Sequence, residues 1–485
     1  MAVQTRAPKI IRQAPRRGLR NIDGRDQTSA EYTTDCLDVY YKDGYVQQRK
    51  GYAKVNTSAM SSTVVERIHG FDSEIHGSHM LVQVDGDIYK RAGNTFTRVL
   101  RSDIAGQRYG FVNGLNTCLI TRAYDQSVLS WDGVTFSGIG GAPRGLYPFF
   151  YRDHFWVGNL IGAGGNKSVL QSSGRRNINS WASGDTWHID SFDGQEVTGI
   201  GQSGRYLAAV KPDSITYIYG SFFLQTSSSF DGQTVAVRRG IGGLSHNALI
   251  NANGLFYTVD KNGIWAIQGA GEASKQITAE IPGFWERVNT NVAGEFCSAH
   301  FPQEGWLLFA LALDGAALPN YILIYDYKRE ALWPLKISTK SMNSITVGSN
   351  KSELYFGDQS GFVYQLMVGD DDSGTAIASY IEWPAFGHES LGYDKLWKEL
   401  KIFGKARGTH TTQIQSWADG KLGNRMQTSS YTNAVKATNQ ETDFRKFVSI
   451  AHTGELLSVK LTSNAAAGTS WAINRIEASA DRVTE

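Results

Sequence analysis

From about residue 58, the chain alternates short apolar runs with polar turns. The turns are marked by pairs such as Asp85-Gly86, Gly93-Asn94 and Asp132-Gly133, which favour tight connections between antiparallel strands. Between residues 214 and 220, apolar and aromatic side chains occupy every second position, so they fall on one face of a strand. The pattern therefore predicts a long series of short β-strands.

The same order of strands and turns recurs about seven times between residues 58 and 375. The units begin near residues 79, 116, 146, 196, 247, 305 and 344, and each holds three or four predicted strands. Repeats of roughly 35–50 residues with short strands are typical of the blades of a β-propeller. A set of stacked β-sandwiches is the alternative fold.

The pattern changes after about residue 375. Apolar and polar residues alternate strictly from Leu457 to Thr462, and the predicted strands here are longer and less often interrupted by turns. We predict an all-β chain with three parts: an N-terminal arm and first hairpin (residues 1–57, turning at Asp43-Gly44), a β-propeller of about seven blades (58–375), and a C-terminal β-sandwich (376–485).

The first twenty residues form an extended basic arm. Its cations are Arg6, Lys9, Arg12, Arg16, Arg17 and Arg20, and it contains no acidic residue. Pro8 and Pro15 argue against a continuous helix. The arm fits a solvated tail, a strap over a neighbouring subunit, or a contact with phosphates. We favour an assembly contact that becomes ordered only when its neighbour is present.

Composition agrees with a β-protein made in a reducing compartment. The 485 residues include 52 glycines but only 10 prolines, and 48 Lys+Arg nearly balance 46 Asp+Glu. Cys36, Cys118 and Cys297 have neither metal-ligand nor redox spacing, so we expect reduced core thiols. No apolar run reaches the roughly 18 residues of a membrane span, and the N-terminus lacks the apolar core of a signal peptide.

Motifs for catalysis or cofactor binding are missing from the sequence. It has no H-E-x-x-H pair, no G-x-S-x-G elbow and no phosphate-binding P-loop. The acidic stretch "GDDDSG" at residues 369–374 places Asp370 and Asp372 close together, but its spacing does not match a calcium-binding loop. We interpret it as a solvated turn, with a cation site as the alternative. We expect no enzyme activity, no cofactor and no metal.

Several short stretches resemble one family of viral proteins. Arg49-Lys50-Gly51-Tyr52 is similar to an R-x-G-(Y/I) motif that follows the opening arm of that family. Further similar stretches are residues 213–221, 238–250, 323–333, 355–366 and 456–477. Together they resemble the propeller-bearing tail hub or nozzle proteins of short-tailed bacteriophages, which are also called packaged-DNA stabilisation proteins.

The resemblance implies a structural protein of the virion tail, made in the host cytoplasm. Such a protein forms a homo-hexameric ring below the portal and adaptor proteins. The ring extends the channel for DNA ejection, contacts packaged double-stranded DNA transiently, helps retain it, and can anchor tail fibres or spikes. Two other functions stay open: a non-viral cytoplasmic propeller that acts as an interaction scaffold, and a glycan-binding or glycan-cleaving propeller that acts as a receptor-binding protein.

Overall fold

The computed structural model describes most of the chain. The described residues are 9–23, 27–101, 106–122, 126–161, 166–190, 193–220, 232–270, 273–347, 351–387, 394–419, 427–433, 441–464 and 467–482. Within them, the helices are one short α-helix, α1 (Pro282–Trp285), and two 3-10 turns, η1 (His246–Ala248) and η2 (Thr290–Glu295). The predicted all-β class is confirmed.

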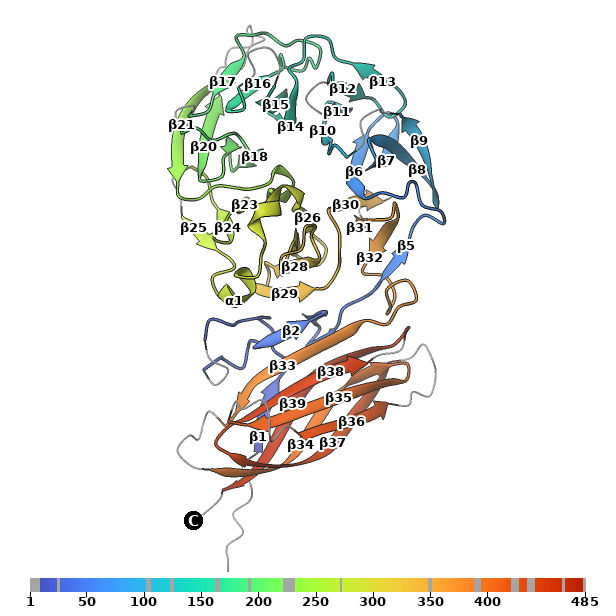
Figure 1. Cartoon of the computed structure of the whole chain (residues 1–485), viewed down its shortest axis with the longest axis vertical. Helices are drawn as coiled ribbons and strands as arrows, with labels where there is room; N and C mark the ends of the chain where they lie inside the picture. The colour runs from blue at the N-terminus through green and yellow to red at the C-terminus, as the bar shows by residue number, and fades with distance from the viewer. Residues whose placement is uncertain are drawn as a thin grey trace, which may run out of the picture.

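Seven four-stranded antiparallel sheets lie around a ring in the described part of the chain (Figure 1). The first four sheets contain β6 (Val65–Ser73), β7 (Gly77–Val84), β8 (Asp87–Ala92) and β9 (Thr95–Leu100); β10 (Gly110–Gly114), β11 (Thr117–Thr121), β12 (Leu129–Trp131) and β13 (Phe136–Gly138); β14 (Gly145–Tyr151), β15 (His154–Leu160), β16 (Val169–Ser172) and β17 (Thr186–His188); and β18 (Gly199–Ser203), β19 (Tyr206–Val210), β20 (Ser214–Gly220) and β21 (Gly232–Arg239). The other three contain β22 (Ile250–Ala252), β23 (Leu255–Val259), β24 (Ile264–Ile267) and β25 (Ser274–Gln276); β26 (Cys297–Phe301), β27 (Trp306–Leu311), β28 (Tyr321–Asp326) and β29 (Ala331–Leu335); and β30 (Ser341–Val347), β31 (Lys351–Gly357), β32 (Val363–Leu366) and β5 (Tyr52–Lys54). The fold is therefore propeller-like.

The last sheet of the ring is completed by a strand from the N-terminal region. Strand β5 pairs antiparallel with β32, so that Tyr52 lies opposite Leu366. The last sheet then contacts the first sheet of the ring, where the Asn343 side chain donates to the carbonyl of Ile68 at 3.2 Å. Residues 52–54 thus belong to the ring, whereas the sequence placed them with the arm.

Two larger sheets lie beside the ring (Figure 1). The six-stranded sheet contains β3 (Val39–Lys42), β4 (Tyr45–Gln48), β39 (Ser470–Arg482), β34 (Lys395–Arg407) and β37 (Glu441–Gly454), with β1 (Lys9–Gln13) paired to β39. The five-stranded sheet contains β2 (Asp35–Leu37), β33 (Ala378–Phe386), β38 (Leu457–Asn464), β35 (His410–Ala418) and β36 (Gln427–Asn433). Four N-terminal strands therefore complete sheets whose other strands come from residues 378–482, so the arm and hairpin are not a separate unit.

Local sequence explains the turns and faces of these sheets. The β3–β4 hairpin turns at Asp43 and Gly44, whose φ angles of 51° and 85° fit the predicted two-residue turn. In β34, Leu400 and Ile402 are buried while Lys401 between them is partly exposed, as alternation requires. One cluster of buried side chains extends from the ring residue Trp333 to Trp383 and Trp397 in the two larger sheets. The ring and these sheets therefore share a core.

Candidate functional site

The chain passes between the ring and the larger sheets at two places that lie side by side. We call this region, residues 49–52 and 367–377, the junction. Backbone hydrogen bonds hold its two segments together: Gly51 donates to Gly369 at 3.1 Å, Tyr52 donates to Asp371 at 3.1 Å, and Val368 donates to Gly51 at 3.0 Å. The junction fixes how the two parts of the molecule are joined.

Gly51 allows this close approach. A Cβ atom added at Gly51 would lie 1.7 Å from the carbonyl oxygen of Asp371, which is far inside contact distance. The neighbouring Tyr52 packs edge-on against the rings of Phe356 and Tyr364, at centroid distances of 5.0 and 5.1 Å. Gly51 therefore permits the close contact of the two segments, and Tyr52 packs one of them against the ring.

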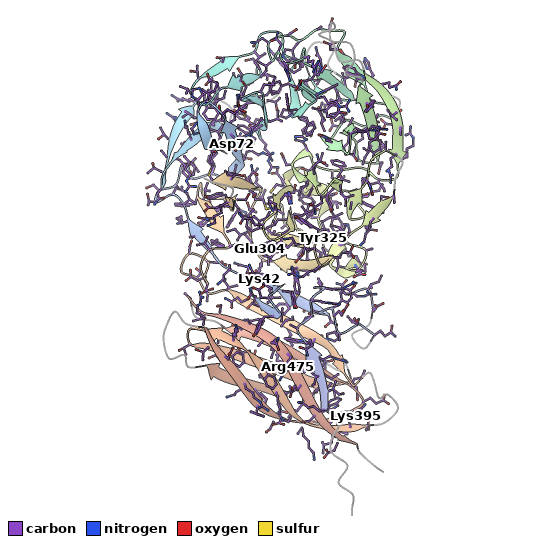
Figure 2. The ribbon with its side chains drawn as sticks, turned by 180° about the vertical axis from the view of Figure 1, so that it is seen from behind. Lys42, Asp72, Glu304, Tyr325, Lys395 and Arg475 are labelled. Carbon is purple, nitrogen blue, oxygen red and sulfur yellow. The ribbon has the colours of Figure 1, made fainter. Side chains whose placement is uncertain are left out.

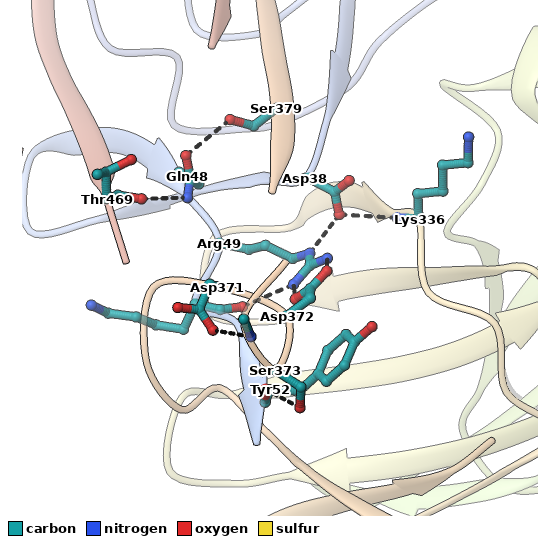
Figure 3. Close-up of polar contacts among 12 residues, drawn as sticks. Asp38, Gln48, Arg49, Tyr52, Lys336, Asp371, Asp372, Ser373, Ser379 and Thr469 are labelled. Carbon is teal, nitrogen blue, oxygen red and sulfur yellow. Dashed lines mark hydrogen bonds and ion pairs between the residues drawn. The ribbon is translucent and has the colours of Figure 1, made fainter. Parts of the chain in front are cut away.

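Arg49 lies at the centre of the junction with only 1% of its side chain exposed. Its Nε donates to Asp38 Oδ1 at 2.5 Å, and its two terminal nitrogens donate to the two carboxylate oxygens of Asp372 at 2.7 and 2.6 Å (Figure 3). Asp38 also accepts the backbone N–H of Lys336, in the ring, at 3.0 Å. Arg49 therefore joins three separate segments of the chain.

Opposing effects act on the pKa values of this cluster. Burial raises the pKa of Asp38, while the charge and hydrogen bond of Arg49 lower it, and the net change is upward. For Arg49, burial acts to lower the pKa, but Asp372 and Asp38 outweigh burial and raise it. The guanidinium is thus held in its charged form by its partners.

A second ion cluster links the junction to the six-stranded sheet. Asp370 accepts from Lys50 Nζ at 2.6 Å and from Arg407, on β34, at 2.9 Å. Burial favours a higher pKa for Asp370, but the two cations outweigh it and lower the pKa. Nearby, Lys42 on β3 pairs with Glu304 in the β26–β27 turn at 2.7 Å, and both lie between ring and sheets in Figure 2.

These contacts correct the interpretation of the acidic loop. The sequence predicted a solvated turn, whereas Asp370 is buried and Asp372 is bound by Arg49. The described residues contain no group of three or more histidine, cysteine, aspartate or glutamate side chains arranged to hold a metal ion. The acidic residues serve as partners of Arg49, Lys50 and Arg407.

The described part of the basic arm lies along its own chain. Residues 9–13 form β1, which pairs antiparallel with β39, and Ala14 N donates to Asn474 O at 2.7 Å. Further on, Leu19 N donates to Leu332 O, in the ring, at 2.8 Å. For residues 9–23, the expectation of an arm that is mobile without a neighbour is therefore wrong. The edge of β39 supplies the backbone partners that the arm needs.

The predicted site residues of the arm have partners within the chain, except Arg6, which lies outside the described residues. Lys9 pairs with Glu477 at 2.8 Å, and Arg12 donates to the carbonyl of Ala385 at 3.4 Å. The remaining contacts are Arg16 with Glu31, Arg17 with Tyr32 at 3.0 Å, and Arg20 with Asp23 at 2.9 Å and Glu280 at 3.3 Å. The structure therefore spreads these cations over both parts of the molecule and does not gather them into one site.

Cys36, Cys118 and Cys297 are buried free thiols, as the sequence predicted. Burial raises the pKa of each thiol, which makes the reactive thiolate rare. In the described segments, no helix is both long and apolar enough to span a membrane.

Comparisons with known proteins give similarity in structure only. No family model and no curated protein sequence matches the chain. The chain is similar to the extracellular domain of a hybrid two-component system from B. thetaiotaomicron (11% identity, 74% of this chain and 45% of that one, TM-score 0.43). It is also similar to the β-propeller domain of Myceliophteria thermophila Cps50 (Swd1) (10% identity, 64% and 99%, TM-score 0.39) and to the N-terminal domain of Nup159 (9% identity, 65% and 95%, TM-score 0.40). The chain spans less than half of the two-component structure.

Proposed function

We propose that this chain is a tail hub or nozzle protein of a short-tailed bacteriophage. In this proposal the seven four-stranded sheets are the blades of a seven-bladed propeller, and the two larger sheets form a β-sandwich. The chain is a structural subunit without enzyme activity. Six copies form a ring in the virion tail, below the portal and adaptor, that surrounds the DNA channel and anchors fibres or spikes.

The junction is the observation that supports this proposal best. A subunit of a DNA conduit must keep its shape while DNA passes through the channel. Here two chain crossings, the buried Arg49 with its two carboxylates, and a shared core join the propeller-like ring to the larger sheets. A buried ion pair is weak evidence for net stability, and in this proposal the cluster instead fixes the arrangement of the two parts. They suit a subunit whose two parts must not move independently.

The arm provides a surface for neighbouring subunits. Ile11 on β1 and Ile22 after it are 46% and 53% exposed, so the arm presents apolar surface to solvent beside its charged side chains. Lys9 and Arg16 keep 50% and 60% of their side chains exposed beside their partners. We propose that the arm, already ordered along its own chain, packs against the next subunit or the adaptor.

The association state of the purified chain tests this proposal. Mass photometry and negative-stain microscopy of the full chain, alone and with portal and adaptor, should show closed rings of six copies. Ile11→Asp with Ile22→Asp should abolish the rings, while Val134→Asp, at a position of the ring that is 68% exposed, should not. A chain that stays monomeric under all these conditions would contradict the proposal and favour a scaffold.

A further inference from the structure

A cavity of about 240 Å³ lies at the inner strands of the ring. Residues from six of the seven four-stranded sheets line this cavity. They include Arg67 on β6, Phe111 on β10, Phe149 on β14, Ile200 on β18, Phe256 on β23 and Ser298 on β26. The strands β6, β10, β14, β18 and β26 lie nearest the centre of the ring in Figure 1. The cavity is thus a central feature of the ring, remote from the junction.

Arg67 is the charged group of this cavity, and no carboxylate in the described part of the chain balances its charge. Its Nε is buried without a hydrogen-bond partner, and among the described residues no carboxylate forms an ion pair with Arg67. The nearby Arg108 is different, because its guanidinium donates to the backbone carbonyls of Glu66 and Gly294 at 3.1 Å and also to that of Lys340. Partial burial of an unpaired guanidinium costs free energy unless a ligand supplies the missing hydrogen bonds and the opposite charge.

The neighbouring Arg108 adds positive potential to the surroundings of Arg67. Burial, assisted by the charge of Arg108, lowers the pKa of Arg67 to about 10, so it stays charged at neutral pH. Burial and the two arginines lower the pKa of His246 to about 3, which keeps its ring neutral. Its Nδ1 accepts the N–H of Ile200 at 3.3 Å, so the ring proton lies on Nε2. None of the described residues that line the cavity carries a carboxylate.

We propose that this cavity binds a small organic carboxylate, with the guanidinium of Arg67 as its anchor. The planar fork of arginine matches the two oxygens of a carboxylate. The phenylalanine and isoleucine walls suit an apolar body attached to that carboxylate. The volume holds roughly eight water molecules, so a ligand of about that many non-hydrogen atoms fits.

Benzoate is a suitable probe because it combines a carboxylate with an apolar ring of this size. Isothermal titration of the full chain at constant ionic strength should show one benzoate per chain, bound more tightly than acetate or inorganic phosphate. Arg67→Met should weaken benzoate binding by roughly 10- to 100-fold, since a charge-assisted pair is lost. Arg67→Lys should give an intermediate benzoate affinity, because lysine keeps the positive charge but lacks the planar guanidinium that binds both carboxylate oxygens.

Arg98→Met is the matched control, since Arg98 is 51% exposed and paired with Asp87 at 3.1 Å on the outside of the ring. It should bind benzoate as the unchanged chain does. Without ligand, Arg67→Met should unfold at the same or a higher temperature, because it removes an unpaired charge. The assignment would be overturned if Arg67→Met unfolded at a lower temperature than the unchanged chain or bound benzoate equally well. It would also be overturned if the unchanged chain bound phosphate more tightly than benzoate or showed no saturable binding.

Discussion

Replacing Arg49 by methionine tests how the junction holds the two parts together. Methionine replaces the aliphatic part of the arginine side chain, but it ends before the guanidinium and donates no hydrogen bond. Asp38 and Asp372, whose side chains are 6% and 15% exposed, would then lose a partner that donates to them at 2.5 to 2.7 Å. The variant removes the guanidinium of Arg49 and keeps an apolar side chain at this position.

The expected loss of stability is large. Removing one member of a buried ion cluster leaves uncompensated charge and typically costs about 3–5 kcal/mol. Total unfolding free energies are only about 5–15 kcal/mol, so this loss should shift unfolding to clearly lower denaturant concentration. The triple variant Arg49→Met, Asp38→Asn, Asp372→Asn should recover part of the loss, because it buries no charge.

The effect should also depend on pH in a defined direction. In the unchanged chain, burial raises the pKa of Asp38 and Arg49 opposes that rise. Without Arg49 the pKa of folded Asp38 rises further above its unfolded value, so the folded state takes up a proton more readily as pH falls. The penalty of Arg49→Met should therefore be full near pH 8 and smaller near pH 5.

Urea unfolding followed by tryptophan fluorescence at pH 8 and pH 5 measures both effects. Arg98→Met provides a control, because Arg98 is 51% exposed and pairs with Asp87 at 3.1 Å in the ring, away from the junction, so it should cost less than about 1 kcal/mol. A loss below about 1 kcal/mol at pH 8, as for an exposed pair, would refute the role given to Arg49. So would a penalty that grows as pH falls.

Three further predictions follow from particular contacts. Gly51→Ala should destabilise the chain by about 3 kcal/mol or more in the same urea assay, because the added Cβ would clash with Asp371. Gly140→Ala is the control: a Cβ there meets open space, so the unfolding free energy should change by no more than about 0.5 kcal/mol. Burial lowers the pKa of His69 to about 4 and that of His246 to about 3. Stability should therefore be full well above pH 6.5 and fall by about 2 kcal/mol for each residue by pH 5, because the unfolded chain takes up protons that the folded chain does not. Replacing both histidines by glutamine should flatten this loss, and an unchanged pH profile would contradict it. Deleting residues 2–13 removes β1, so hydrogen exchange should increase along the freed edge of β39, and unchanged protection there would contradict the pairing.

The repeated units and their turns could be predicted from sequence because their signals are local. Each unit brings neighbouring strands together through short turns, and pairs such as Asp85-Gly86 specify those turns by their backbone preferences. The long alternating strands after residue 375 carry the same kind of signal. Strand order within each four-stranded ring sheet follows chain order, apart from β5. The pairing of neighbouring strands was therefore enough to predict these sheets.

The pairing of N-terminal strands with strands far along the chain could not be predicted in this way. The pairing of β1 with β39 and of β5 with β32 joins residues hundreds of positions apart, and a short apolar run does not specify so distant a partner. Arg49 and the acidic stretch at 370–372 were both noticed in the sequence, but nothing local showed that they are partners. Arg67 carried no signal at all, since its importance depends on six sheets that meet at the centre of the ring.

Immunogold electron microscopy of virions, with antibodies against this chain, tests the central claim most directly. The particles would come from the genome that encodes the chain. The account predicts label at the tail, below the site where head and tail join, with several copies in each particle. Virions that lack the label while the chain stays free in the infected cell would contradict the assignment as a tail hub or nozzle protein.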